Sequence, residues 1–273
     1  MARLEYKYLV PCGELSRLRQ RLAPFVELDP YAAAEPDGEY TVRSIYFDTP
    51  GLDCYTQKLS GIHTRRKIRI RGYGTHREDA FAILEIKRKA DMRVSKNRSF
   101  AFHSHLQELL ASGDVEKNIL IRSAPETERV LRSARAFLFH VFRYSMYPVV
   151  LVVYEREAFL GRFDPSVRLT FDKRLRSRAH PRVESLFAEE GLNGAMDEHF
   201  ILEVKFQTAM PTWVEATLEE FELERRALSK YTICLEREEL GNQSRWSGYL
   251  SSMRGERPFG VDFGRLAAGW RTG

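Results

Sequence analysis

Charged and apolar residues alternate along several short stretches of this chain. In residues 83–89, Glu85, Lys87 and Lys89 occupy every second position, with Leu84 and Ile86 between them. Successive side chains of a β-strand point to opposite faces, so this pattern predicts a strand with one charged and one apolar face. Similar patterns predict further strands at residues 3–10, 40–48, 65–73, 91–102, 147–157, 166–172 and 200–206.

Helical spacing of apolar residues predicts the elements between the strands. In residues 126–142 one stripe is apolar, as expected for a helix that packs on a core; it consists of Val130, Leu131, Ala134, Phe137, Leu138 and Val141. Shorter helices are predicted at residues 13–26, 105–112 and 212–226. We therefore expect an α+β fold in which the strands form a closed antiparallel β-barrel and the helices pack outside it.

The charged strand faces could point to solvent or to the barrel interior. Antiparallel strands usually turn their polar face to water, and for any one strand here the two directions are about equally plausible. Across the set, however, like charges on neighbouring strands oppose one another, which is destabilising unless an anion or a carboxylate intervenes. We therefore expect a polar, basic interior, and we expect Tyr6, Tyr8 and Tyr46 on the opposite faces.

Composition limits the choice of compartment and organisation. The chain has 273 residues, with 43 Lys and Arg against 38 Asp and Glu, a mild excess of +5. Its three cysteines are widely spaced, which favours a reduced, cytoplasmic setting over a disulfide framework. No stretch has the length and apolarity of a signal core or a membrane span. We expect one domain over residues 1–240 and a tail of uncertain structure over 241–273.

An interior rich in cations needs a ligand of high negative charge density, and a linear phosphate chain fits. Arginine offers two parallel contacts to phosphate oxygens, and lysine acts as a point charge. Glu5, Glu85 and Glu203 would repel phosphate, so their presence predicts a divalent cation that bridges them to it. The sequence lacks the Walker phosphate loop, the HExxH zinc motif and the GxSxG nucleophile motif.

Nine motifs occur in order along residues 1–235: Arg-x-Glu-x-Lys at 3–7, Ser-Ile-Tyr-Phe-Asp at 44–48, Lys-Ile-Arg-Ile-Arg-x-Tyr at 67–73, Leu-Glu-Ile-Lys at 84–87, Val-Ser-Lys-x-Arg at 94–98, Tyr-x-Arg-x-Ala-Phe at 154–159, Val-Arg-Leu-Thr-Phe-Asp at 167–172, Leu-Glu-Val-Lys-Phe at 202–206 and Ser-Lys-Tyr at 229–231. Together they resemble the VTC domain, the catalytic domain of the vacuolar transporter chaperone complex and a branch of the triphosphate tunnel metalloenzymes (CYTH-like). The resemblance implies a tunnel of antiparallel strands that binds triphosphate with Mg²⁺ or Mn²⁺. Fungal members of the family make inorganic polyphosphate from the γ-phosphate of ATP.

The resemblance and the alternation together define the candidate site. Catalytic roles are expected for Lys87, Arg69, Arg71, Arg156 and Glu203. Substrate binding is expected for Lys7, Arg43, Lys58, Lys67, Lys89, Lys96, Arg98, Tyr154, Arg168, Lys205 and Lys230. Metal binding is expected for Glu203, with Glu5 and Glu85 assisting. Two positions depart from the family pattern: Arg3 replaces a glutamate, and Ala227 stands where related enzymes have a lysine.

The expected activity is metal-dependent phosphoryl transfer, with synthesis of polyphosphate from ATP as the first choice. A tripolyphosphatase or nucleoside triphosphatase, and a non-catalytic polyphosphate-binding module, remain open alternatives. Nucleic acid is disfavoured as a partner because a groove for single strands would need stacking aromatics on the charged face. Coupling of synthesis to transport would require a separate membrane protein.

Overall fold

The computed structural model describes residues 4–62, 64–90, 93–121, 123–241 and 259. Ten strands form one antiparallel sheet in these residues, and eight of them follow the order β1-β10-β8-β7-β3-β4-β5-β6, while β2 pairs with β7 and β9 with β8. The strands are β1 (Leu4–Pro11), β2 (Val26–Leu28), β3 (Tyr40–Asp48), β4 (Arg65–Tyr73), β5 (Phe81–Ala90), β6 (Arg93–Phe102), β7 (Tyr147–Gly161), β8 (Arg168–Ala179), β9 (Asn193–Met196) and β10 (His199–Phe206). The expected α+β fold with a large antiparallel sheet is therefore confirmed.

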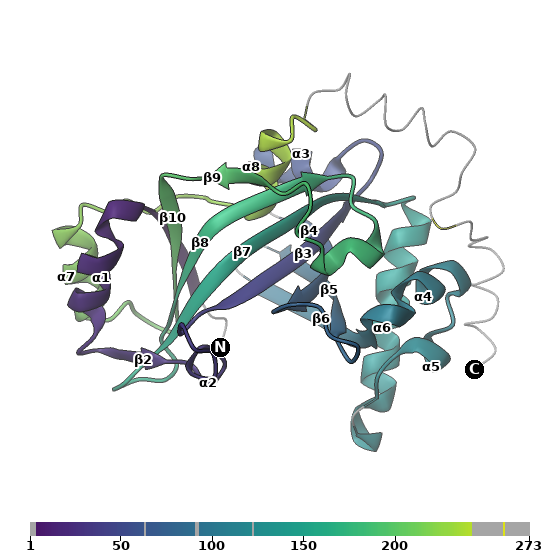
Figure 1. Cartoon of the computed structure of the whole chain (residues 1–273), viewed down its shortest axis with the longest axis horizontal. Helices are drawn as coiled ribbons and strands as arrows, with labels where there is room; N and C mark the ends of the chain where they lie inside the picture. The colour runs from purple at the N-terminus through teal and green to yellow at the C-terminus, as the bar shows by residue number, and fades with distance from the viewer. Residues whose placement is uncertain (1–3, 63, 91–92, 122, 242–258, 260–273) are drawn as a thin grey trace.

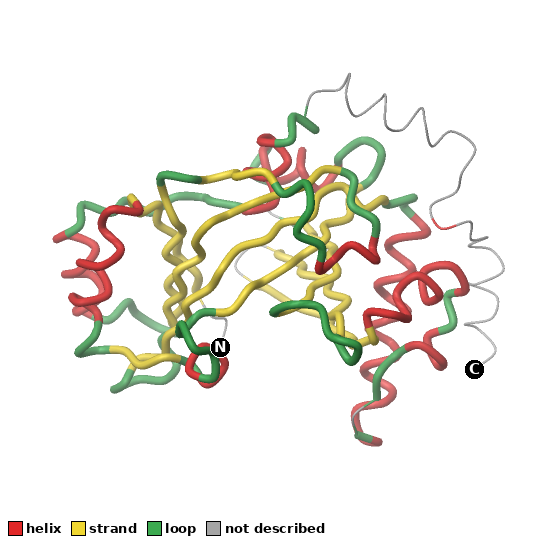
Figure 2. Tube along the Cα trace, viewed as in Figure 1, coloured by secondary structure: helices red, strands yellow, loops and turns green. Residues whose placement is uncertain are grey.

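Helices lie at the two ends of the sheet and along its upper side, and one short helix lies at its lower edge (Figures 1 and 2). They are α1 (Leu15–Leu22), α2 (Pro30–Ala33), α3 (Asp53–Leu59), α4 (Leu106–Ser112), α5 (Val115–Asn118), α6 (Thr127–Arg143), α7 (Thr212–Glu220) and α8 (Lys230–Arg237). Four 3-10 turns complete the elements: η1 (Cys12–Glu14), η2 (His103–His105), η3 (Ala124–Glu126) and η4 (Val183–Phe187). The expected tail over 241–273 lies outside the described residues apart from Gly241 and Phe259.

The strand ladders do not close into the expected barrel. In the described residues the strand order begins at β1 and ends at β6, so the sheet is open. Its two ends nevertheless approach each other, because Lys87 of β5 places its Nζ 3.4 Å from a carboxylate oxygen of Glu5 on β1. The outer edge of β1 is covered by the segment after α7, where Arg226 donates its backbone N–H to the carbonyl of Lys7 at 2.8 Å.

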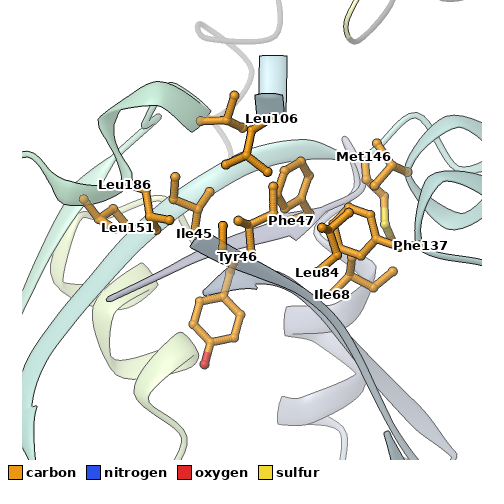
Figure 3. Close-up of a cluster of buried hydrophobic side chains, with 14 of the residues drawn as sticks. Ile45, Tyr46, Phe47, Ile68, Leu84, Leu106, Phe137, Met146, Leu151 and Leu186 are labelled. Carbon is orange, nitrogen blue, oxygen red and sulfur yellow. The ribbon is translucent and has the colours of Figure 1, made fainter. Parts of the chain in front are cut away.

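Two apolar clusters lie on the outer side of the sheet. α1 and α7 cover β1, β8 and β10, with Leu18, Leu22 and Val214 among the buried residues. The larger cluster includes the whole predicted stripe of α6, which packs on β5 and β6, and Phe137 of this helix also meets Phe47 of β3 (Figure 3). The expectation that helices cover the apolar strand faces is correct for these helices.

α8 is an exception, because it packs on the opposite side of the sheet. Its Tyr231 ring stacks on the Tyr46 ring of β3 with centroids 5.0 Å apart. Figure 3 shows Tyr46 pointing away from Ile45 and Phe47, which face the outer cluster. Tyr231 also donates its hydroxyl to Asp48 at 2.5 Å, and the same buried carboxylate accepts the backbone N–H groups of Cys54 and Tyr55 in α3. One carboxylate thus joins β3, α3 and α8.

Candidate functional site

Charged side chains from seven strands share one side of the sheet, which we call the charged face. Directly opposed residues of an antiparallel ladder lie on the same face, so the register places these side chains together. Lys7 opposes Glu203, Arg156 opposes Asp172, Arg69 opposes Glu85, and Glu85 opposes Arg98. The charged face comprises Glu5, Lys7, Lys67, Arg69, Arg71, Glu85, Lys87, Lys89, Lys96, Arg98, Tyr154, Arg156, Arg168, Asp172, Glu203 and Lys205, with Lys58 of α3 and Lys230 of α8 beside them.

On β1 and β10 the two glutamates enclose a lysine. The Nζ of Lys7 lies 3.2 Å from Glu5 and 3.4 Å from Glu203, and Glu203 also pairs with Lys205. Burial alone would raise the pKa of Glu203, but the charges of Lys205 and Lys7 lower it well below its ordinary value. Burial and the charge of Glu203 would likewise raise the pKa of Glu5, yet Lys7 and Lys87 lower it to about 2. Both carboxylates are therefore ionised at neutral pH.

Arg156 of β7 is held by a bidentate contact with Asp172. It donates to both carboxylate oxygens of Asp172, at 2.6 and 2.8 Å, and Lys230 pairs with the same carboxylate. Lys230 also lies 4.7 Å from the centre of the Tyr154 ring, and Arg156 donates to the Tyr154 hydroxyl at 3.3 Å. This group holds Arg156 and Lys230 in set positions on the charged face.

Arg69 of β4 is held in a similar way. It donates to the hydroxyl of Tyr46 at 2.9 Å and pairs with Glu85, whose second oxygen accepts from Arg98 at 2.8 Å. Glu85 is only 1% exposed, and both of its oxygens are engaged by arginines. It is therefore a counter-ion for Arg69 and Arg98, and the structure gives no support to its expected role as a metal ligand.

A third group of cations is not neutralised by carboxylates in this way. Among the described residues, Lys67 donates to the Ser229 hydroxyl at 2.7 Å, and Lys58 to the Ala227 carbonyl at 3.1 Å. Lys87 is directly opposed by Lys67 on one side and by Lys96 on the other. Burial lowers the pKa of Lys67 well below its ordinary value, and the charges of Lys7 and Lys87 lower it further. Among the described residues, no carboxylate pairs with Lys67 or Lys96, and Lys87 shares Glu5 with Lys7.

Arg43 does not join the charged face. Its side chain is 2% exposed on the opposite side of β3, where it donates to the Gly74 carbonyl at 3.0 Å and pairs with Glu189 of a distant loop. The placement of Tyr46 was wrong in the same way, since its hydroxyl meets Arg69 on the charged face. Both errors arose because the residues of β3 were assigned to the wrong faces of the strand. Alternate residues point to opposite faces, so a shift of one residue exchanges the two faces.

At the margin of the face, Arg168 pairs with Asp29 at 2.9 Å, and its side chain is 38% exposed.

Three residues that were not predicted to belong to the site contact residues that were. They are Tyr46, Asp172 and Ser229, which contact Arg69, Lys230 and Lys67 respectively. The alternation over 168–172 contains a signal for Asp172. The positions of Tyr46 and Ser229 depend on contacts between distant segments.

In the parts of the chain that the structure describes, no three His, Cys, Asp or Glu side chains gather closely enough to hold a metal ion by themselves. Glu5 and Glu203 form a pair, since both reach the same Nζ of Lys7. None of the described helices combines the length and apolarity needed to cross a membrane.

The chain is similar to known proteins over most of its length. Residues 2–237 match the family model of the VTC domain. Vacuolar transporter chaperone complex subunit 4 of Trypanosoma brucei brucei is 25% identical over 247 residues, covering 78% of this chain and 31% of that protein. Subunit 4 of Schizosaccharomyces pombe is 27% identical over 207 residues, covering 63% and 28% respectively. The matched region is therefore about a third or less of these relatives, and the chain belongs to the VTC domain family.

Proposed function

We propose that this protein transfers the γ-phosphoryl group of ATP to the end of an inorganic polyphosphate chain on the charged face, with the help of a divalent cation. The observation that carries the proposal is the lysine charge of Lys67, Lys87 and Lys96, which oppose one another across β4, β5 and β6 and which, among the described residues, pair with one carboxylate, that of Glu5 beside Lys87. A ligand with one negative charge or more per phosphate would neutralise it along its whole length. Family membership supports the same substrate class.

Arginines and lysines take different parts in this proposal. Arg69, Arg71 and Arg156 hold non-bridging oxygens through their planar guanidinium groups. Lys87 neutralises the transferring phosphoryl group. The other proposed phosphate contacts are Lys7, Lys58, Lys67, Lys89, Lys96, Arg98, Tyr154, Arg168, Lys205 and Lys230. Arg43 is not included, because it is buried on the other face against Glu189.

The donor set suits a cation that completes its ligand shell with phosphate oxygens and water. Glu5 and Glu203 lie together and are ionised, and Mg²⁺ is often bound by one or two carboxylates plus substrate phosphates. We propose that these two residues hold Mg²⁺ or Mn²⁺. When bound, such an ion supplies positive charge to phosphate oxygens.

The low pKa of the nearby carboxylates favours transfer to phosphate over transfer to water. Hydrolysis would gain from a general base, and Glu5 and Glu85 are the candidates. The pKa of Glu5 is lowered to about 2, and that of Glu85 is lowered by Arg69 and Arg71 against the opposing effect of burial. Bases this weak activate water poorly at neutral pH. A terminal phosphate already carries negative charge, so positioning and charge neutralisation suffice.

The proposed setting is the cytoplasm, alongside a separate membrane protein if synthesis is coupled to transport. Cys12, Cys54 and Cys234 are all free thiols, as expected in a reducing compartment. The curated relatives are subunits of a complex by name, which supports a search for partner proteins.

Incubation with ATP and Mn²⁺ or Mg²⁺, followed by separation of the products, tests the proposal. Long polyphosphate is the expected product. If free phosphate or tripolyphosphate forms without polymer, the protein is a triphosphatase and not a polymerase. If triphosphate binds tightly but is not turned over, the protein is a non-catalytic binding module. Lys87→Ala serves as the inactive comparison, and Arg132→Gln on the exposed side of α6 as the matched control.

A further inference from the structure

The back of the β4–β5 hairpin carries a second cluster of cations. Arg66 and Arg88 are directly opposed in the ladder, and their neighbours Lys67 and Lys87 belong to the charged face. Successive residues of a strand point to opposite faces, so Arg66 and Arg88 project to the outer side. There both arginines meet His140, which lies near the end of α6 and is 8% exposed.

The two arginines approach different nitrogens of the same ring. Arg66 Nη1 lies 3.1 Å from Nδ1 of His140, and Arg88 Nη2 lies 3.1 Å from Nε2. A neutral imidazole has one acceptor nitrogen and one N–H, whereas guanidinium groups only donate. At most one of the two contacts is therefore a hydrogen bond, and the other brings two N–H groups together. Protonation would make both contacts donor–donor, and burial and then Arg66 and Arg88 lower the pKa of His140 to about 4.

The surroundings add positive charge without balancing it. The guanidinium of Arg66 lies 4.5 Å from the centre of the Tyr144 ring, and that of Arg143 lies 5.8 Å from it. Arg88 also donates to the amide oxygen of Asn97 at 2.8 Å. Within the part of the chain that the structure describes, Arg66, Arg88 and Arg143 have no carboxylate partner.

We propose that Arg66, Arg88 and His140 form a phosphate-binding site on the outer side of the sheet, separate from the charged face. A bound phosphate would accept from both guanidinium groups and from the imidazole N–H, and so remove the donor–donor contact. Arginine pairs with phosphate through two parallel N–H···O bonds, and the oxygens of a tetrahedral phosphate point in different directions, which suits donors that converge from two strands and a helix. The phosphate group belongs either to free orthophosphate or to a polyphosphate chain.

The test follows the ring nitrogens of His140 by ¹⁵N NMR at neutral pH, assigned through His140→Gln. Orthophosphate, tripolyphosphate and acetate are added in separate titrations at equal ionic strength. We expect orthophosphate to shift the ring signals saturably and acetate to leave them unchanged. A response to tripolyphosphate alone would identify the polyphosphate chain as the source. No response to either phosphate, or an equal response to acetate, overturns the proposal.

Variants separate this site from the charged face. Arg66→Gln with Arg88→Gln should weaken the phosphate response by at least about tenfold, since each removes a charged hydrogen bond. Arg132→Gln, on the same helix as His140, should leave it unchanged. Product formation from ATP is measured in parallel, so that loss of one site is distinguishable from loss of the other. If the double variant fails to fold, the titration of the unaltered protein still shows whether phosphate binds beside His140.

Discussion

Glu85→Gln should make the charged face depend on its ligand for stability. Glu85 is 1% exposed and is the shared counter-ion of Arg69, which is 13% exposed, and Arg98, which is 44% exposed. Removing one partner of a buried ion pair usually costs about 3–5 kcal/mol, because an uncompensated charge stays buried. Since Arg98 is partly solvated, we expect a loss near the lower end, about 3 kcal/mol in the free energy of unfolding.

Tripolyphosphate should restore much of this loss. A ligand at a hundred times its dissociation constant stabilises the folded state by about 2.7 kcal/mol. The variant also lacks a carboxylate that repels phosphate, so the ligand should stabilise it at least as much as the unaltered protein. Urea unfolding with and without tripolyphosphate measures both quantities. Glu126→Gln, which breaks an exposed pair with Arg129, should change the stability by about 1 kcal/mol or less.

Two outcomes would contradict this reasoning. If Glu85→Gln unfolds at the same urea concentration as the unaltered protein, Arg69 and Arg98 do not depend on Glu85. If the variant is destabilised but tripolyphosphate no longer stabilises it, the arginines released from Glu85 do not bind phosphate.

Three further predictions concern activity, pH and strand parity. Glu203→Gln and Lys87→Ala should each lower product formation from ATP on the order of 10²–10³ fold, with circular dichroism to check folding; unchanged turnover in both would remove the assigned site. Affinity for tripolyphosphate should fall as pH rises through 8, because burial and then Lys87 lower the pKa of Lys96 to about 8 and a neutral amine no longer attracts phosphate; calorimetry at pH 7 and at higher pH checks the sign, and a rise in affinity would refute it. Arg43→Gln should lower the melting temperature through lost contacts to Gly74 and Glu189, yet leave tripolyphosphate affinity unchanged; weaker binding would return Arg43 to the site.

Alternation predicted the charged face well where a strand carries charges at every second position. In β10, in residues 67–71 of β4 and in residues 84–87 of β5, every residue between two charges is apolar, so the assignment of the two faces was unambiguous. β3 lacks this regularity. Arg43 is its one cation, but it lies among buried residues, and its partner Glu189 comes from a loop whose approach no local pattern predicts.

Element ends and tertiary closure were harder to predict. α7 ends at Glu220 instead of at the predicted Arg226. Two residues after this end, Glu222 adopts a positive φ of 49°, which an α-helix does not allow. α8 was missed, although Ser229 is a typical N-cap that accepts from the backbone of Thr232 at 3.4 Å. The expected barrel closure is not confirmed in the described residues, where the strand order runs from β1 to β6 without joining. The edge of β1 is covered instead by the segment around Arg226, which has no strand periodicity in its sequence.

Most arginines of the charged face have buried carboxylate partners, whereas the opposed lysines Lys67, Lys87 and Lys96 have one carboxylate among the described residues, Glu5. This difference predicts opposite effects of salt on folding and on binding. Raising the ionic strength from about 0.01 M to about 0.1 M shortens the Debye length from about 30 Å to about 10 Å. Screening should then relieve the repulsion between Lys67 and Lys87, while the ion pair of Arg156 with the fully buried Asp172 is affected much less. The ligand-free protein should therefore gain stability with salt, while its affinity for tripolyphosphate falls. Melting temperature and calorimetry over this range measure the two responses. A ligand-free protein that loses stability with salt would mean that attraction, not repulsion, dominates the charged face, and a phosphate chain would not be needed to balance it.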